Sequence, residues 1–116
     1  MASYGQQAAY RTQQTFIRLT DAWTALEPSS TWNSSGGATT PLTRRFAIKV
    51  FNVGTAGASR VALSYDNGIK INVAPHWLGA GQFIVEPAAT GLTLYGRAKL
   101  ASGVNSIRVV ITEYGH

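Results

Sequence analysis

The sequence predicts an all-β protein, an antiparallel β-sandwich of about seven strands, jelly-roll or immunoglobulin-like, with an extended N-terminal arm. Two observations support this fold class. Apolar and polar residues alternate over several short runs, and Gly, Pro, Asn and Asp separate these runs, so no helix is required. At 116 residues the chain fits one domain, which we divide into the arm, residues 1–14, and the sandwich, residues 15–116.

The arm, residues 1–14, is rich in Gln and Ala and has no hydrophobic periodicity. Such a segment cannot bury enough apolar surface to order by itself. Tyr4, Tyr10 and Arg11 supply apolar area together with hydrogen-bonding groups, which favours ordering against a partner. The alternative is a floppy tail.

The first strand is predicted over Thr15–Leu26, where alternation is long. Phe16 and Ile17 are adjacent and both large, so we expect a bulge at which the buried face switches. The loop Ser29–Thr43 follows and is longer than most connections. Its Trp32 either caps the open end of the sandwich or lies in a subunit or ligand contact.

The clearest strand pattern lies between Arg60 and Pro87. After a strand over Arg45–Val53 and a glycine-rich turn, the run Arg60–Tyr65 alternates and leads into Asp66-Asn67-Gly68. An Asn-Gly pair tolerates the positive φ of tight hairpin turns, so we predict an antiparallel hairpin with Ile69–Val73. Leu63 is expected to face the core of the sandwich.

The remaining strands follow a second loop. In Ala74–Gly81, Pro75 and the glycines rule out a helix. Its His76 has no metal-site spacing and no paired nucleophile, so we expect it to be a solvated or hydrogen-bonded loop residue. Three further strands complete the predicted seven: Gln82–Glu86, Leu92–Ala98 and Asn105–Tyr114.

The composition is apolar but poorly charged. Hydrophobic residues make up 45% and charged residues 13%, against roughly 25% charged residues in typical soluble domains. Such a surface is typical either of a protein covered by neighbouring subunits, which favours a homo-oligomer such as a dimer or trimer, or of a small polar monomer. No segment resembles a signal peptide or a membrane span, and the absence of cysteine makes cytoplasmic folding the default.

The net charge of +5 is concentrated in the first half, where residues 1–60 hold six basic and two acidic side chains. No acid falls between Pro28 and Tyr65, and the basic residues there are Arg44, Arg45, Lys49 and Arg60. The functional interpretation of this charge is an acidic protein surface as partner, and a solvated basic rim is the alternative that stays equally open. Nucleic acid is an unlikely partner, because the basic residues lack dense clustering and interleaved aromatic residues.

No motif indicates catalysis. The two histidines, His76 and His116, have no metal-site spacing and no paired nucleophile, and five scattered carboxylates give no preferred acid–base pair. We therefore expect no enzymatic activity, no cofactor and no metal. The candidate site residues are those of a partner contact: Tyr4, Tyr10, Arg11, Trp32, Arg44 and Arg45.

The order of several short phrases over about residues 45–115 resembles that of small β-sandwich structural proteins of tailed bacteriophage virions. In such proteins a strand ending in an aspartate turn precedes a glycine-flanked loop and a Phe strand, and the last strand ends near a Glu. The matching phrases are Asn52-Val53-Gly54, Val61-Ala62-Leu63-Ser64-Tyr65-Asp66, Leu78-Gly79-Ala80-Gly81-Gln82-Phe83, Leu92-Thr93-Leu94-Tyr95-Gly96 and Ile107-Arg108-Val109-Val110-Ile111-Thr112-Glu113-Tyr114.

The resemblance implies a virion component without enzymatic activity. A decoration or cement protein would bind the major capsid protein or another virion protein on the capsid surface after synthesis in the host cytoplasm. Capsid exteriors are often acidic and offer seams for an arm, which favours this role over a head-tail or tail adaptor. A carbohydrate-binding module that stacks sugars on Trp23, Trp32 and Trp77 is a further alternative.

Overall fold

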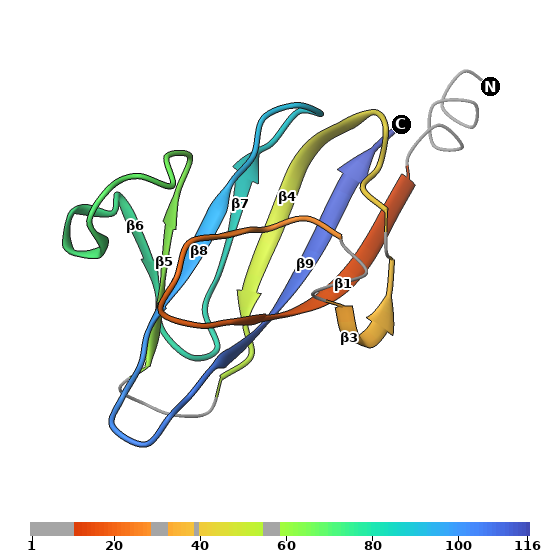
Figure 1. Cartoon of the computed structure of the whole chain (residues 1–116). Helices are drawn as coiled ribbons and strands as arrows, with labels where there is room; N and C mark the ends of the chain where they lie inside the picture. The colour runs from red at the N-terminus through yellow and green to blue at the C-terminus, as the bar shows by residue number, and fades with distance from the viewer. Residues whose placement is uncertain (1–10, 29–32, 39, 55–58) are drawn as a thin grey trace.

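The computed structural model describes residues 11–28, 33–38, 40–54 and 59–116. Within these residues the chain forms nine strands and one short 3-10 helix, Ile71–Val73. The strands are β1 (Arg11–Leu19), β2 (Thr24–Ala25), β3 (Asn33–Gly37), β4 (Arg45–Asn52), β5 (Arg60–Ser64), β6 (His76–Leu78), β7 (Phe83–Pro87), β8 (Tyr95–Lys99) and β9 (Ile107–Gly115). Five form one sheet in the order β3-β1-β9-β4-β7, and four form a second in the order β2-β8-β5-β6 (Figure 1). The prediction of an all-β, antiparallel protein is confirmed.

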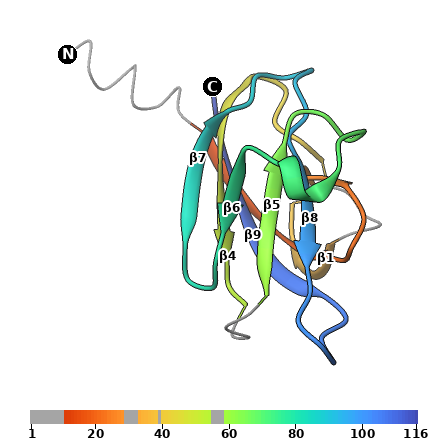
Figure 2. The ribbon, with the colours of Figure 1, turned by 90° about the vertical axis from the view of Figure 1, so that its left-hand side faces the viewer.

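One hydrophobic core joins the two sheets, and Figure 2 shows β5, β6 and β8 in a layer in front of β4, β9 and β1. Successive side chains of a strand point to opposite faces, so alternate residues enter the core. The five-stranded sheet contributes Ile17, Leu19, Ile48, Val50, Ile107, Val109 and Ile111, and the four-stranded sheet contributes Val61, Leu63, Leu78 and Ala98. The predicted inward orientation of Leu63 is therefore correct.

The strands pair in a nested order when β3 is left out. β1 pairs with β9, β2 with β8, β4 with β7 and β5 with β6. β4 also pairs with β9, and β5 with β8, which joins these pairs into sheets. The chain therefore follows the path of one long antiparallel hairpin that alternates between the two sheets.

The predicted hairpin between Arg60–Tyr65 and Ile69–Val73 is wrong. The first run forms β5, but the second is a loop with a 3-10 turn, and β5 pairs instead with β6. Neither Asn67 nor Gly68 has the positive φ that the predicted turn requires. The Asp66 Oδ1 accepts a hydrogen bond from the Gly68 N–H (2.8 Å), and this local turn replaces the tight hairpin.

The predicted strand Thr15–Leu26 is two strands in different sheets. β1 ends at Leu19, and β2 starts at Thr24 in the four-stranded sheet. The chain crosses between the sheets at Thr20 to Trp23, where the Trp23 Nε1 donates to the Ile69 carbonyl (2.9 Å). The buried face does not switch at Phe16 and Ile17, since Thr15, Ile17 and Leu19 are all buried; the β1–β3 register shifts there, and the chain changes sheet only after Leu19.

β1 begins at Arg11, inside the segment assigned to the N-terminal arm. Arg11 pairs with Gly115 and Gln14 with Thr112, so residues 11–14 belong to the five-stranded sheet. The rest of the arm, including Tyr4 and Tyr10, lies outside the described residues.

The predicted loop Ser29–Thr43 contains the edge strand β3. Asn, Ser and Gly have low strand propensity, so this composition predicts a loop. Gly37 at its end has a φ of 96°, and a Cβ there would lie 2.7 Å from the Gln14 carbonyl oxygen. The close approach of β3 to β1 therefore requires glycine at this position.

The other predicted strands differ from the observed ones mainly at their ends. Arg45–Val53, Gln82–Glu86 and Asn105–Tyr114 correspond to β4, β7 and β9, whereas Leu92–Ala98 starts three residues before β8. His76, predicted in a loop, lies in β6. Over the described ranges, no helix has the length and apolar character needed to span a membrane.

Candidate functional site

The outer face of the five-stranded sheet carries a row of apolar side chains. Phe16 of β1 pairs with Val110 of β9, Val110 pairs with Phe51 of β4, and Phe51 pairs with Phe83 of β7. Their strand neighbours Ile17, Val50 and Val109 are buried, so these four side chains point away from the core. We call Phe16, Val110, Phe51 and Phe83 the apolar row.

Exposure along this face is greatest at β7. Phe83 is 58% exposed and Val85 is 52% exposed, and Val85 pairs with Lys49 of β4. β7 is one of the two edge strands of its sheet (Figure 1). Contiguous exposed apolar residues at the surface of a folded domain mark a contact surface more often than isolated ones do.

Three cations surround the apolar row. The Lys49 Nζ lies 4.4 Å from the centroid of the Phe83 ring, and the Arg108 guanidinium carbon lies 5.0 Å from that of Phe16. Arg18 pairs directly with Arg108 across β1 and β9. The acidic residues of β1, β4, β7 and β9 are Glu86 and Glu113, which pair with Ile48 on the opposite side. The part of this outer face around the apolar row is therefore apolar and positively charged, and the neutral polar residues Gln14 and Thr112 adjoin it.

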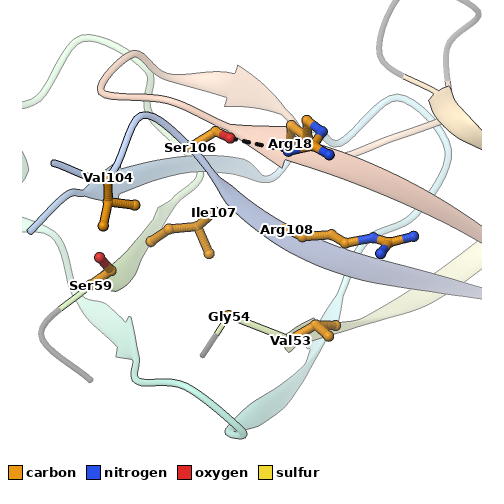
Figure 3. A pocket seen from close by; sticks show the side chains of 8 residues that line it. All are labelled: Arg18, Val53, Gly54, Ser59, Val104, Ser106, Ile107 and Arg108. Carbon is orange, nitrogen blue, oxygen red and sulfur yellow. Dashed lines mark hydrogen bonds between the residues drawn. The ribbon is translucent and has the colours of Figure 1, made fainter. Parts of the chain in front are cut away.

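A pocket of about 420 Å³ lies beside the two arginines, where β4 ends and β9 begins (Figure 3). Its walls combine apolar and hydroxyl groups with the two guanidinium side chains. The residues that line it are Arg18, Val53, Gly54, Ser59, Val104, Ser106, Ile107 and Arg108. The Arg18 Nη1 donates to the Ser106 Oγ (3.4 Å) at its rim.

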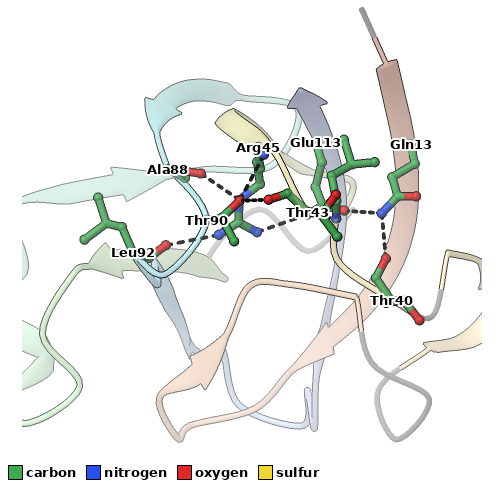
Figure 4. A network of polar contacts seen from close by, with 9 residues as sticks. Gln13, Thr40, Thr43, Arg45, Ala88, Thr90, Leu92 and Glu113 are labelled. Atoms are coloured by element: carbon green, nitrogen blue, oxygen red, sulfur yellow. Dashed lines mark hydrogen bonds and ion pairs between the residues drawn. The ribbon is translucent and has the colours of Figure 1, made fainter. Parts of the chain in front are cut away.

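Arg45, predicted to bind a partner, is instead buried. Its side chain is 3% exposed and its Nη1 lies 3.0 Å from the Glu113 Oε2, while the Glu113 side chain is fully buried. The Arg45 Nε donates to the Ala88 carbonyl (2.7 Å) and the Nη2 to the Leu92 carbonyl (3.0 Å) (Figure 4). The guanidinium therefore holds the 88–92 loop against β9 and is not available to another molecule.

The Glu113 carboxylate is also bound from the other side. Its Oε1 accepts a hydrogen bond from the Gln13 Nε2 (2.6 Å), and its Oε2 accepts one from the Leu42 N–H (3.3 Å). The Gln13 Nε2 also donates to the Thr40 carbonyl (2.7 Å). This network, shown in Figure 4, joins β1, β4 and β9 to the chain around residues 40–42, which is a structural role.

The other predicted site residues do not gather with the apolar row. Arg11 and Arg44 are exposed; Arg11 pairs with Gly115, and the Arg44 carbonyl accepts a hydrogen bond from the His116 N–H (3.1 Å). Both lie at the far end of β1 and β9 from Arg18 and Arg108. Tyr4, Tyr10 and Trp32 lie outside the described residues.

Adjacent pairs of large apolar residues are the sequence signal for this outer face. Large apolar residues stand next to each other in Phe16-Ile17, Val50-Phe51 and Val109-Val110. One member of each pair enters the core, so the other must project from the opposite face of the sheet. When β1, β4 and β9 are known to be neighbours, the three adjacent apolar pairs predict an apolar outer face for their sheet.

A polar cluster joins the edge strands of the two sheets. The Tyr65 hydroxyl donates to the Pro87 carbonyl (2.7 Å) and lies 3.2 Å from the Glu86 Oε2, and the His76 Nε2 lies 3.2 Å from the Glu86 Oε1. Partial burial, and then the charge of the Glu86 carboxylate, raise the pKa of the Tyr65 hydroxyl above its ordinary value of 10.0.

We expect this pKa to make stability fall at high pH. The Tyr65 pKa is higher in the folded than in the unfolded protein. The contribution of Tyr65 to the free energy of unfolding is therefore complete below pH 10.0 and is lost as the pH rises through the folded-state pKa. In urea unfolding above pH 10.0, the wild type should lose stability with pH more steeply than Tyr65→Phe. Equal slopes would mean that folding does not perturb the Tyr65 pKa.

No known protein family matches this chain, and no curated protein matches its sequence. In the part of the chain that the structure describes, no three His, Asp or Glu side chains are grouped so that they would hold a metal ion.

Proposed function

We propose that this chain is a non-enzymatic structural protein of a phage virion that binds and stabilises the capsid, as a decoration or cement protein does. The outer face of the five-stranded sheet is its docking surface, and the major capsid protein or another virion protein is its partner. The observation that carries this proposal is the apolar row with Lys49, Arg18 and Arg108 around it and no acid on the same face of β1, β4, β7 and β9, as far as the structure describes them.

We further infer that the fold is a jelly-roll β-sandwich rather than an immunoglobulin-like one. The nested pairing of β1 with β9, β2 with β8, β4 with β7 and β5 with β6 is the arrangement of eight jelly-roll strands, with β3 added at one edge. Jelly rolls occur in viral capsid proteins, but also in lectins and cupins. The choice among these roles therefore rests on the docking surface and not on the fold.

Charge complementarity favours an acidic partner. The apolar row supplies desolvated contact area, and the surrounding cations steer an acidic surface toward it and fix its orientation. A second copy meeting the same face would bring two sets of Lys49, Arg18 and Arg108 together, which repulsion disfavours. The dimer or trimer expected from the sequence stays a prediction, and we expect it to use other surfaces.

Of the three tryptophans of the carbohydrate-binding alternative, Trp32 lies outside the described residues, and the hydrogen bond of Trp23 and the guanidinium contact of Trp77 do not favour a sugar platform. Trp23 donates to the Ile69 carbonyl, and the Arg60 guanidinium carbon lies 4.8 Å from the centroid of the Trp77 ring. Both indoles are half-buried. An adaptor position in the head or tail would use the same docking surface, and the location of the protein on the particle distinguishes it from a decoration role.

The direct test is binding to capsids of the phage that encodes the chain, prepared without this protein. We expect wild-type protein to co-sediment with these capsids, more weakly at high salt. The double change Lys49→Glu with Phe83→Ser should weaken binding at least about tenfold, or about 1.4 kcal/mol, because it reverses one charge and removes exposed apolar area from the docking surface.

The matched control is Lys70→Glu with Val73→Ser, which makes the same kinds of change in the loop after β5. Lys70 is exposed and Val73 is 62% exposed. This control should bind within about twofold of wild type, since neither residue is on the outer face. Absence of wild-type binding would contradict the proposed function, whereas equal binding by all three proteins would contradict only the docking surface.

A further inference from the structure

Arg18 and Arg108 occupy opposite positions on β1 and β9, and their guanidinium groups extend toward different neighbours. They are direct cross-strand partners, and like charges in such positions destabilise a sheet. Over the described residues neither arginine forms an ion pair: Arg18 donates to the Ser106 hydroxyl and Arg108 lies over the Phe16 ring. Since guanidinium groups keep their charge in proteins, the repulsion is permanent in the free molecule.

The pocket beside this pair is suited to an apolar group. Val53, Val104 and Ile107 line it together with the Ser59 and Ser106 side chains, and its volume is about 420 Å³. Figure 3 shows the Arg18 and Arg108 side chains on neighbouring strands, with Ser106 joined to Arg18 and Val53 on the side of Arg108. An apolar surface thus lies directly next to two unpaired positive charges.

We propose that Arg18, Arg108 and this pocket form a site for an acidic residue of a partner polypeptide. The carboxylate accepts hydrogen bonds from the Arg18 guanidinium beside the pocket, and the charge of Arg108 on the neighbouring strand adds to the attraction, while a neighbouring apolar side chain of the same partner enters the pocket. Arginine matches this ligand because its planar donors bind carboxylates in a bidentate manner. The bound charge also removes the repulsion between the two arginines.

A polypeptide fits this site better than a nucleic acid does. Proteins that follow a nucleic-acid strand combine a groove of many cations with aromatic faces free for base stacking. Among the described residues that line the pocket the cations are Arg18 and Arg108, no aromatic side chain is among them, and the face of Phe16 is covered by Arg108. The site deepens the proposed function and rests on it, because it is one end of the proposed docking surface.

The test is a titration of the whole ¹⁵N-labelled protein with the peptide acetyl-Ala-Leu-Glu-Leu-Ala-amide, followed by NMR. We expect weak but saturable binding, with shifts at the amides of residues 18, 53–54 and 104–108. The matched peptide with Gln in place of Glu should bind at least about fivefold more weakly, because it keeps the shape and removes the charge.

Arg18→Gln should cause a similar loss of affinity for the Glu peptide. The control is Lys99→Gln, which removes an exposed positive charge on β8 and should leave this affinity unchanged. Arg18→Gln should not lower the melting temperature, because it relieves repulsion; a purely structural Arg18 would lower it. Equal affinity for the two peptides, or no shifts up to about 20 mM peptide, would overturn the proposal.

A single-stranded thymidine oligonucleotide of about ten nucleotides tests the other source of anions. If it shifts the same amides with higher affinity than the Glu peptide, the site takes phosphate and the proposal is wrong. The titration contains no capsid, so its failure leaves the capsid-binding result intact, and a failure of capsid binding leaves the peptide result intact.

Discussion

Replacing Arg45 with Met is expected to lower the free energy of unfolding by about 3 to 5 kcal/mol, because it leaves the buried Glu113 carboxylate without a positive charge. The hydrogen bonds from Gln13 and the Leu42 N–H remain but do not neutralise the charge. The Ala88 and Leu92 carbonyls also lose their donors. Urea unfolding at neutral pH measures the change.

Two further variants distinguish the effect of leaving Glu113 unpaired in the core from the effect of removing any positive charge. Lys49→Met removes a cation from the outer face of the same strand and should cost less than about 1 kcal/mol. Arg45→Met combined with Glu113→Leu should recover much of the stability lost by Arg45→Met alone, since no unpaired charge then remains in the core. A loss below about 1 kcal/mol for Arg45→Met would mean that water reaches Glu113.

Leu63→Ala is expected to cost about 2 to 5 kcal/mol, because it removes a large side chain from the centre of the core and leaves a cavity. Leu63 is fully buried and pairs with Gly96 of β8. Gly96 has no side chain, and Leu19 and Leu26 fill the space beside it. If Gly96 had a Cβ, that atom would lie only 2.9 to 3.3 Å from the Cδ atoms of these two leucines. The core around Leu63 is therefore closely packed.

The control for Leu63→Ala is Leu92→Ala, a chemically identical change at a side chain that is 43% exposed. It should change stability by less than about 0.5 kcal/mol in the same urea experiment. A loss below about 0.5 kcal/mol for Leu63→Ala as well would show that β5 has the opposite register in solution, with Leu63 on the outside.

Strand positions were largely predictable from alternation, because a period of two is a local property of the sequence. Ile107, Val109 and Ile111 of β9 showed which side of that strand enters the core before any partner strand was known. The hairpin after Tyr65 was not predictable in the same way. Asn67 and Gly68 allow a tight turn but do not require it, and the bond from Asp66 to the Gly68 N–H decided the local conformation.

The candidate site was harder to predict because it depends on residues far apart in the chain. A basic residue is expected at the surface unless it has a buried partner. Arg45 has such a partner 68 residues away, and only the pairing of β4 with β9 brings the two together. The pairings of β9 with β1 and with β4 align Phe16, Val110 and Phe51, none of which is near another in the sequence.

The position of β9 has a consequence for the order in which the protein folds. β9 is the last of the nine strands to be synthesised, and it lies between β1 and β4 in the middle of its sheet. Until it emerges from the ribosome, β1 and β4 lack their shared neighbour, and Arg45 lacks Glu113. Contacts between such distant segments also slow folding, since a long loop must close first. We therefore expect the five-stranded sheet to form after translation of β9 and not during synthesis of the earlier strands.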